Sequence, residues 1–353
     1  MAKQQFNLSF LKAVAKEFLG DKAIISGIER YGKGAINDSF RVVSGGCSYL
    51  LQRINGNYFP EPLKLMDNFR IISVCQPDGL KAIAAANDLW HLDKNGSYWR
   101  MYRFFDHSYS CQKIADTYQA YEIARAYGKY LASLSQLPMG SLNVVVPSFH
   151  DTDVRYSQLV TAELLDEFGC ATSCQSEINF VKSKASEIED FRALLSNGSI
   201  PVRLTHNDTG IDNVLLDKRT GAAVAVIDWD TTMPGYSLWD FGDMFRSALG
   251  VEFDDPIGSA QCFDALLRGY LAGTGKLLLT EEIINFPLAG RIISLELGIR
   301  YLTDYLSGDK VFGYSDGASL LRARKSFLRY RMMEAVDDKI KGIVDKLLAV
   351  YVS

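Results

Sequence analysis

The 353-residue sequence lacks several features that would place a protein quickly. Its six cysteines form no C-x2-C pair, and the closest spacing is the C-x3-C of Cys170 and Cys174. Structural zinc and a disulfide framework are therefore disfavoured, and reduced thiols in a cytoplasmic protein are expected. There is no run of eighteen apolar residues, so no membrane span is expected. Lys12, Lys16 and Glu17 interrupt the apolar N-terminal stretch, which favours an amphipathic helix over a signal peptide.

The sequence also lacks a large excess of charge of either sign. The formal net charge is −4 and the sequence pI is about 5.7, with basic residues scattered along the chain. This pattern excludes the electrostatic footprint of a nucleic-acid-binding protein, so neither a nucleic acid nor a membrane is expected as a partner. A G-x4-G-K-[ST] motif is absent as well, which disfavours a P-loop nucleotide site.

Ample apolar material is present, at 48% of the residues, and the chain is long for one core. Residues 23–54 alternate apolar and polar side chains around two glycine-containing breaks, which predicts three antiparallel strands joined by hairpins. A helix is expected over about residues 60–75 and a further strand over 97–105. We therefore expect an N-terminal lobe, residues 1–107, with an antiparallel sheet and one or two helices.

From about residue 113 the pattern becomes helical. One helix is expected in the stretch "EINFVKSKASEIEDFRALLSNG", ended by Gly198. Two short strands around the turn at 217–221 interrupt the helices. This predicts an α+β protein whose C-terminal lobe, residues 108–353, is mainly helical and carries a small β-hairpin insertion.

The stretch "LTHNDTGIDNVLLD" has the spacing H-x-D-x4-N, formed by His206, Asp208 and Asn213. Phosphoryl transfer to a hydroxyl needs a carboxylate to take the proton and oxygen ligands for a hard cation. Asp208 and Asn213 supply a carboxylate and an amide from one loop, and Asp228 follows the next hairpin. Each residue alone fits an ordinary turn, but their order along the chain favours catalysis. His206 is interpreted as structural, and Asp230 as a second metal contact or a loop-capping residue.

The N-terminal strands offer candidates for nucleotide binding. Gly32 and Gly34 allow close approach of the backbone to phosphates, and Asn37 follows them. The strand "SYLLQRIN" contains no lysine. Strand alternation sends Gln52 and Arg53 to opposite faces, and Arg53 is expected to face the phosphates.

The motifs "HNDTGIDN", "VIDWDTTMPG" and "WDFGDMFR" resemble those of the aminoglycoside phosphotransferase and choline kinase superfamily, whose members have a protein-kinase-like two-lobe fold. The resemblance implies that the N-lobe, residues 1–107, binds the nucleotide and that the C-lobe, residues 108–353, provides the catalytic and substrate-binding groups, with Asp240 as a structural acid of the C-lobe. The chain is similar in more detail to bacterial N-acetylhexosamine 1-kinases, through "SIPVRLTHNDT", "IDWDTTMPG", "DFGD" and "YLLQRIN...FP". This similarity extends from Ile28 to about Asp309.

The resemblance implies ATP- and Mg2+-dependent phosphorylation of the anomeric hydroxyl of a hexose or N-acetylhexosamine, within carbohydrate metabolism. Asp208 would be the base and contact the sugar together with Arg300, while Asn213 and Asp228 would bind the metal. The adenine would lie at the hinge and against two apolar side chains, which are assigned to Arg103, Phe104, Phe105, Leu215 and Ile227.

Some positions depart from these relatives and leave the acceptor open. Gly210 stands where protein kinases and the sugar kinases have a lysine. Ala35, Ser247 and Val311 stand where larger side chains surround the sugar, and such losses alter substrate choice. A kinase for choline, ethanolamine or an aminoglycoside is the alternative enzyme. A nucleotide-binding pseudokinase scaffold is the other alternative, favoured by the missing strand lysine and disfavoured by the three intact site residues. The oligomeric state is open.

Overall fold

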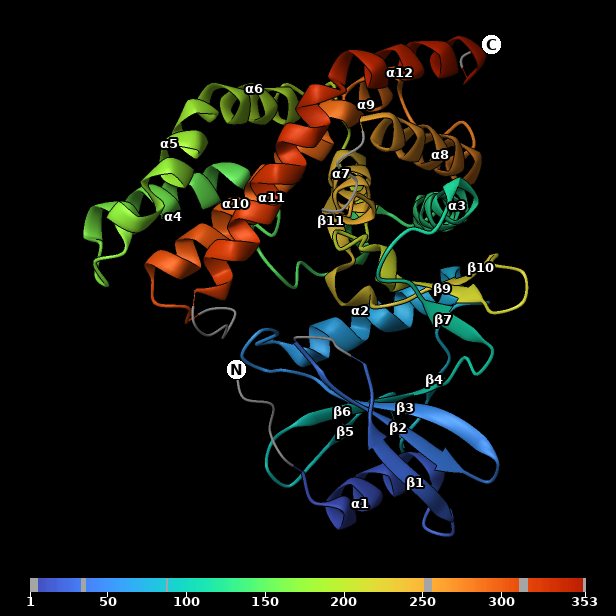
Figure 1. Cartoon of the computed structure of the whole chain (residues 1–353). Helices are drawn as coiled ribbons and strands as arrows, with labels where there is room; N and C mark the ends of the chain where they lie inside the picture. Colours follow the sequence, from blue (N-terminus) through green and yellow to red (C-terminus); the bar gives the residue numbers. More distant parts are fainter. Residues whose placement is uncertain (1–5, 33–35, 87, 251–255, 311–316, 352–353) are drawn as a thin grey trace.

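The computed structural model of the chain has two lobes, one built around a sheet and one mainly helical (Figure 1). It describes residues 6–32, 36–86, 88–250, 256–310 and 317–351. The expected division after residue 107 falls between β6 (Tyr98–Arg103) and β7 (Ser108–Ser110). The predicted α+β, two-lobe architecture is confirmed.

The N-lobe sheet is antiparallel, with strand order β1-β2-β3-β6-β4, and β5 also pairs with β6. The strands not yet delimited are β1 (Ile25–Arg30), β2 (Asp38–Ser44), β3 (Cys47–Arg53), β4 (Ala82–Ile83) and β5 (His91–Leu92). The β2–β3 hairpin turns at Gly45 and Gly46, whose φ values of 57° and 76° suit glycine. The three hairpin-linked strands predicted from the sequence are therefore present.

A helix covers each face of this sheet. Helix α1 (Leu8–Leu19) begins after Asn7, whose side chain accepts a hydrogen bond from the Ser9 N–H, and it packs on the face carrying Leu51 and Trp99. Helix α2 (Pro62–Cys75) packs between the other face and the C-lobe, with Phe69 in the core shared by both lobes (Figure 1). Alternate residues of β3 and β6 therefore face either α1 or the second lobe.

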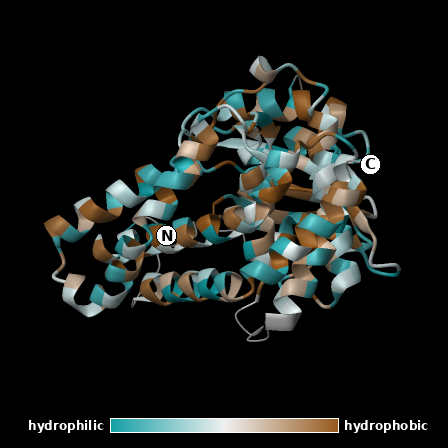
Figure 2. Cartoon of the chain, turned by 90° about the horizontal axis from the view of Figure 1, so that it is seen from above, coloured by the Kyte–Doolittle hydropathy of each residue, from teal (hydrophilic) through white to brown (hydrophobic). Residues whose placement is uncertain are grey.

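Helix α10 lies at the centre of the C-lobe and contacts α4, α7 and α11, while α3 packs along α8. Figure 2 shows both hydrophobic and hydrophilic residues along the helices of the chain. Their bounds are α3 (Thr117–Leu134), α4 (Thr152–Leu165), α5 (Gln175–Ser183), α6 (Ala185–Ser196), α7 (Ser237–Ala248), α8 (Pro256–Thr274), α9 (Thr280–Ile284), α10 (Phe286–Leu306), α11 (Ala318–Ala335) and α12 (Asp337–Tyr351).

The helix expected in the stretch ending at Gly198 is in fact two helices, α5 and α6. The break is at Lys184, whose φ of −104° and ψ of 8° leave the helical range. Its ammonium group contacts the ring of Tyr330 and pairs with Glu334 on α11. Packing against a distant helix thus overrides a continuous helical pattern.

Short strands hold the loops between these helices. Strand β8 (Arg203–Thr205) pairs with β11 (Met233–Gly235), and β9 (Val214–Asp217) pairs with β10 (Ala223–Val226) and with β7. The predicted pair of strands about residues 217–221 is β9 and β10. These pairings bring the segment after β8 beside the segment after β10, which are the two segments that carry the catalytic motif.

The six cysteines are free thiols. Within the described ranges no group of three or more His, Cys, Asp or Glu side chains is arranged to bind a metal ion. In the same part of the chain, no helix combines the length and the apolar character that crossing a bilayer requires.

Candidate active site

The loop after β8 is held by a carboxylate of α7. Asp240 accepts hydrogen bonds from the backbone N–H of His206 at 3.1 Å and of Asn207 at 2.7 Å. Burial raises the pKa of Asp240 to about 7, while the two N–H groups act in the opposite direction. The sequence assigned Asp240 a structural part, and the geometry places it beneath the catalytic loop.

The buried side chain of Asn207 holds the loop through hydrogen bonds to the backbone. The sequence analysis did not identify this residue. Its φ of 64° is in the left-handed region, which asparagine tolerates better than most residues. Its side-chain amide donates to three carbonyl oxygens, at 3.1, 3.0 and 3.2 Å, those of Thr205, Thr231 and Met233. The loop is thereby tied to both strands of the β8–β11 pair.

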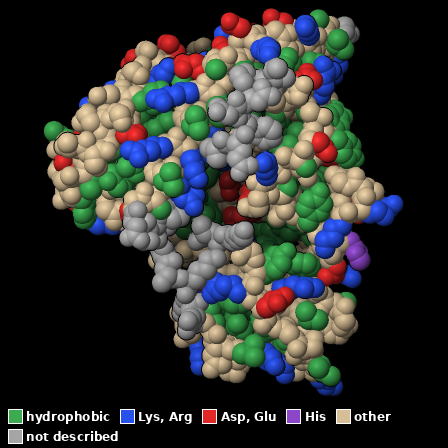
Figure 3. Space-filling model, in the orientation of Figure 1, with side chains coloured by type: hydrophobic (Ala, Val, Ile, Leu, Met, Phe, Trp, Pro, Cys, Tyr) green, Lys and Arg blue, Asp and Glu red, His purple; other side chains and the backbone are tan. Residues whose placement is uncertain are grey.

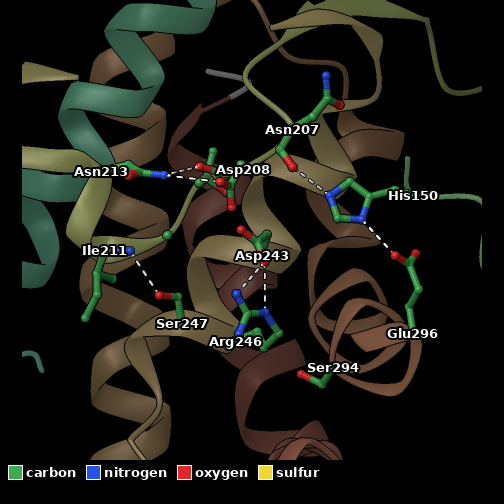
Figure 4. A network of polar contacts seen from close by, with 12 residues as sticks. His150, Asn207, Asp208, Ile211, Asn213, Asp243, Arg246, Ser247, Ser294 and Glu296 are labelled. Atoms are coloured by element: carbon green, nitrogen blue, oxygen red, sulfur yellow. Dashed lines mark hydrogen bonds and ion pairs between the residues drawn. The ribbon is translucent and has the colours of Figure 1, made fainter. Parts of the chain in front are cut away.

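A second anchor reaches the loop from α10. The His150 Nε2 atom lies 2.7 Å from the Asn207 carbonyl, and its Nδ1 atom lies 3.1 Å from Glu296 Oε1 (Figure 4). Thr152 donates to the other oxygen of Glu296 at 3.0 Å. No local pattern in the sequence indicates this pair, because 146 positions separate His150 from Glu296.

Asp208 follows the anchored residue and points toward Asn213 and α7 (Figure 4). The Asn213 amide donates to the Asp208 carbonyl at 3.0 Å and lies 3.4 Å from its carboxylate Oδ2. Burial raises the pKa of Asp208, followed by the charges of Asp243 and Asp212, while Arg246 lowers it. A raised pKa makes a carboxylate a stronger proton acceptor.

His206 is buried and both of its ring nitrogens are engaged. Nε2 lies 3.0 Å from the Ile227 carbonyl, and Nδ1 accepts from the Asp208 N–H at 3.3 Å. Burial lowers the pKa of His206 to about 4. The neutral ring therefore joins the loop to the segment before Asp228, a geometry that fits the structural interpretation.

Asp228 follows β10 with a left-handed backbone, φ 60° and ψ 58°. Asp228 is exposed to solvent. Figure 3 shows acidic atoms in the hollow between the lobes. The surrounding protein atoms raise its pKa, and the nearby carboxylates of Asp230 and Asp208 raise it further. Asp208, Asn213 and Asp228, predicted from separate segments, thus meet in one place.

Asp230 joins the two lobes. Its oxygens accept hydrogen bonds from Arg100 Nη1 and Nη2 at 2.6 and 2.7 Å, and from Asn37 at 2.8 Å. Arg100 also donates to Gln52 at 2.9 and 3.1 Å, and only 2% of Arg100 and 6% of Asp230 is exposed. Arg100 of β6 therefore extends from the sheet toward the C-lobe, where it forms an ion pair with Asp230.

The expectation that Arg53 faces the phosphates is wrong. Its guanidinium donates to Asp38 at 2.7 Å and lies 5.2 Å from the ring centre of Phe6, on the α1 side of the sheet. Leu51, two positions earlier, shares this face and is buried against α1. Gln52 faces the cleft instead. The sequence did contain a signal for Arg100. It lies between Trp99 and Met101 in β6, which are buried against α1, so alternation places Arg100 on the opposite face of the sheet.

The other residues expected to contact the nucleotide lie along the cleft and hinge. Gly32 is exposed with φ 78°, whereas Gly34 lies outside the described residues. Arg103 is exposed at the end of β6, and the half-buried Phe104 contacts the guanidinium of Arg41. Three half-buried apolar side chains complete the set, namely Phe105, Leu215 and Ile227.

Of the residues expected near the acceptor, Arg300 and Ser247 lie in the described part of the chain. Arg300 projects from α10 over the ring of Phe149, with its guanidinium carbon 5.5 Å from the ring centre. Ser247 accepts a hydrogen bond from the Ile211 N–H at 3.0 Å, so its hydroxyl anchors the loop (Figure 4). Ala35 and Val311 lie outside the described residues.

Gly210 completes the loop without a side chain. A Cβ at this position would lie 2.7 Å from Asp212 Oδ1 and 3.9 Å from the Asn213 amide nitrogen. The Gly210 carbonyl accepts a hydrogen bond from the Tyr127 hydroxyl at 2.7 Å. The close atom belongs to the end of the exposed Asp212 side chain, which can move, so the loop leaves room for a Cβ at Gly210.

The fold resembles that of solved phosphotransferases and kinases. An aminoglycoside phosphotransferase from Alicyclobacillus acidocaldarius superposes with a TM-score of 0.63 at 14% identity, covering 98% of this chain and 99% of that chain. A spectinomycin phosphotransferase in complex with ADP and spectinomycin gives 0.59 at 14%, covering 95% and 99%. An ethanolamine kinase from Plasmodium vivax gives 0.59 at 15%, covering 96% and 93%. At 14–15% identity, these similarities are evidence for a shared fold and for nothing beyond it.

Family membership follows from the sequence itself. Residues 27–278 match the phosphotransferase enzyme family, which is well over half of the chain. The chain therefore belongs to this family, and the predicted membership in the aminoglycoside phosphotransferase and choline kinase group is confirmed. The prediction of a small-molecule phosphotransferase is confirmed at this level.

The pair formed by Arg100 and Asp230 predicts a large loss of stability when one partner is removed. Asp230→Asn should lower the free energy of unfolding by about 3–5 kcal/mol, because Arg100 would remain buried without its counter-charge. Denaturant titration measures this change. The double change Arg100→Met with Asp230→Leu should recover much of the loss. Equal unfolding midpoints for the wild type and Asp230→Asn would contradict the expectation.

The pair formed by His150 and Glu296 predicts a pH-dependent stability. Burial opposes ionisation of the ring, but Glu296 raises the pKa of His150 overall, and Asp243 acts in the same direction. The folded pKa is thus above the unfolded value of about 6.5. The stabilisation is complete below pH 6.5 and is lost as the pH rises through the folded value.

Glu296→Gln should therefore lower Tm more at pH 6 than at pH 9, as measured by circular dichroism. Glu334→Gln, which removes the more exposed ion pair with Lys184, is the control and should show no such trend. A Tm difference for Glu296→Gln that is independent of pH would show that His150 does not carry the charge.

Proposed function

We propose that the protein is an ATP- and Mg2+-dependent sugar 1-kinase that phosphorylates the anomeric hydroxyl of a hexose or hexose derivative. The observation that carries the proposal is the meeting of Asp208, Asn213 and Asp228 at the floor of the cleft between the lobes. The motif resemblance to N-acetylhexosamine 1-kinases supports a sugar as the acceptor. The six free thiols support a cytoplasmic location.

The residues present fit a magnesium ion. Asn213 uses its amide nitrogen toward Asp208, and its Oδ1 accepts no hydrogen bond from the described residues. Asp228 offers a solvent-reachable carboxylate, and repulsion from Asp230 and Asp208 favours a cation there. When bound, magnesium would supply charge neutralisation for the phosphates. Asn213 and Asp228 would be its protein ligands.

In this mechanism Asp208 accepts the proton of the anomeric hydroxyl as its oxygen forms a bond to the γ-phosphorus. The bond between that phosphorus and the ADP oxygen breaks, and the products are ADP and a sugar 1-phosphate. Asp240, Asn207 and His150 keep Asp208 in position through the loop backbone. Arg100 supplies the buried positive charge on the sheet face of the cleft.

The nucleotide would lie between the sheet and the β9–β10 strands. The adenine would contact the hinge at Phe104 and Phe105, with Leu215 and Ile227 beneath it. Gly32 and Asn37 would approach the phosphates. The Asn37 side chain supports this placement, because it also accepts the Asn55 N–H at 3.0 Å and is therefore fixed next to Asp230.

ATP consumption with magnesium, measured on a panel of acceptors, tests the proposal. The panel comprises hexoses, N-acetylhexosamines, choline, ethanolamine and aminoglycosides. A sugar should be turned over, and phosphorus NMR should identify a 1-phosphate. A 6-phosphate would contradict the anomeric acceptor, turnover of choline or an aminoglycoside alone would identify another kinase, and tight ATP binding without turnover would support a scaffold.

The role of Asp208 predicts a specific kinetic defect. Asp208→Asn should lower kcat by about 10²- to 10⁴-fold, because loss of a positioned general base has this cost. ADP release at saturating acceptor measures it. Asp212→Asn is the matched control, since this exposed carboxylate lies on the same loop and should leave kcat within a few-fold. Full turnover by Asp208→Asn with an unchanged Tm would remove Asp208 from the mechanism.

A further inference from the structure

Four side chains form a cluster that Tyr58 connects to Asp208, because the Tyr58 phenol interacts electrostatically with Asp208, Arg155 and Arg300, and we call the four the acceptor wall. They are Tyr58 of the N-lobe, Phe149, Arg155 of α4 and Arg300 of α10. Phe149 is buried, and the other three are half-buried. Basic side chains border the hollow between the lobes, whereas its floor is acidic (Figure 3). The wall therefore carries a charge opposite to that of the floor.

The two arginines are attached to the same short segment. Arg155 Nη2 donates to the carbonyl of Ser148 at 2.8 Å and lies 3.4 Å from that of Phe149. Arg300 lies over the Phe149 ring at 5.5 Å. The next residue, His150, contacts the Asn207 carbonyl at 2.7 Å. The segment therefore contacts both guanidinium groups and, through His150, the loop that carries Asp208.

Arg155 has only neutral partners in the described structure. Besides the two carbonyls, its Nη1 donates to the amide oxygen of Gln158 at 3.2 Å. Its Nε is buried and has no hydrogen-bond partner among the described residues. A buried donor of a charged group is costly to leave without an acceptor.

The two guanidinium groups are close enough to oppose each other. Burial lowers the pKa of Arg155, and the charge of Arg300 lowers it further. The phenol of Tyr58 is hydrogen-bonded to Arg300; burial raises its pKa, and both arginines lower it. An anion placed between the arginines would relieve this repulsion.

The nearby carboxylates are already engaged. Glu296 acts on both arginines, but its oxygens contact His150 at 3.1 Å and Thr152 at 3.0 Å. Asp243 pairs with Arg246 at 2.7 Å. Asp151 also acts on Arg155, and its Oδ1 accepts a hydrogen bond from the Val154 N–H at 3.1 Å, so each of these three carboxylates has a cation or a donor of its own.

We propose that the acceptor carries an oxyanion, the carboxylate of a sugar acid or the phosphate of a sugar phosphate, held by Arg155 and Arg300. The inference rests on the proposed function and names the class of its substrate. Guanidinium groups bind such oxyanions through paired, charge-assisted hydrogen bonds. An acceptor with an ammonium group, such as ethanolamine, would be repelled by the same pair. The oxyanion serves only for binding and takes no part in the reaction. The anomeric hydroxyl of the same molecule faces Asp208.

Initial rates with MgATP should separate acceptors of similar size and different charge. The probes are glucose and N-acetylglucosamine as neutral sugars, glucuronate and galacturonate as acids, glucose 6-phosphate, and glucosamine as a cation. We expect at least one anionic sugar to exceed the neutral sugars in kcat/KM by about 10-fold or more. Its KM should rise with ionic strength. Comparing the acids with glucose 6-phosphate distinguishes a carboxylate from a phosphate.

Arg155→Gln should reduce the ratio of kcat/KM for the anionic sugar to that for a neutral sugar by about 10- to 100-fold, mainly through KM. Arg155→Lys should restore part of the ratio, because lysine returns the positive charge but cannot form the paired hydrogen bonds of a guanidinium group. Arg268→Gln on α8 is the control, since that arginine forms an exposed pair with Asp264 and should leave the ratio unchanged. Tm is measured for each variant.

Two results would overturn the inference and leave the kinase in place. One is a preference for neutral or cationic sugars over every anionic probe. The other is an anion-to-neutral ratio that Arg155→Gln does not alter while Tm is retained. Absence of ATP consumption with all probes would instead reject the sugar-kinase proposal and this inference with it.

Discussion

The site depends on one interaction, the acceptance of two consecutive backbone N–H groups by the buried Asp240 carboxylate. This contact fixes the peptide units of His206 and Asn207, and Asp208 is the next residue along the chain. Asn207 extends the support to strands on either side, and His150 adds a contact from the opposite direction. A carboxylate that is held through its backbone keeps its side chain available for the proposed proton transfer. The arrangement explains why so many buried polar groups gather beneath one carboxylate.

The same principle extends across the cleft. Asp230 is two residues beyond Asp228, and its partners Arg100 and Asn37 belong to the N-lobe. Trp229, between the two acids, is buried and lies 5.2 Å from the ring of Phe69 on α2. The segment carrying Asp228 is therefore held by both lobes. A nucleotide that alters the separation of the lobes would also act on this segment, so the metal binding proposed for Asp228 would be linked to that separation.

The sequence predicted the parts of the site that are local and periodic. The hairpins were readable from their glycines, and Asp208, Asn213 and Asp228 from their order along the chain. Arg53 was misplaced because alternation separates the faces of a strand but does not tell which face α1 covers; that depends on Phe6 and Asp38, distant in sequence. The contact between His150 and Glu296 arises only when α4 and α10 pack together, so no spacing could indicate it. The break at Lys184 depends on α11 in the same way.

The segment from Ser148 to His150 has two neighbours at once, the wall that would face an acceptor and the loop that carries the base. For protein engineering, this means that acceptor choice and base position are not independent modules. Exchanging Phe149 or its surroundings to admit a different molecule would also disturb His150, whose partner Glu296 is one helical turn from Arg300. A transplant of specificity between members of this family should therefore move the segment, the start of α4 and the facing turn of α10 as one unit.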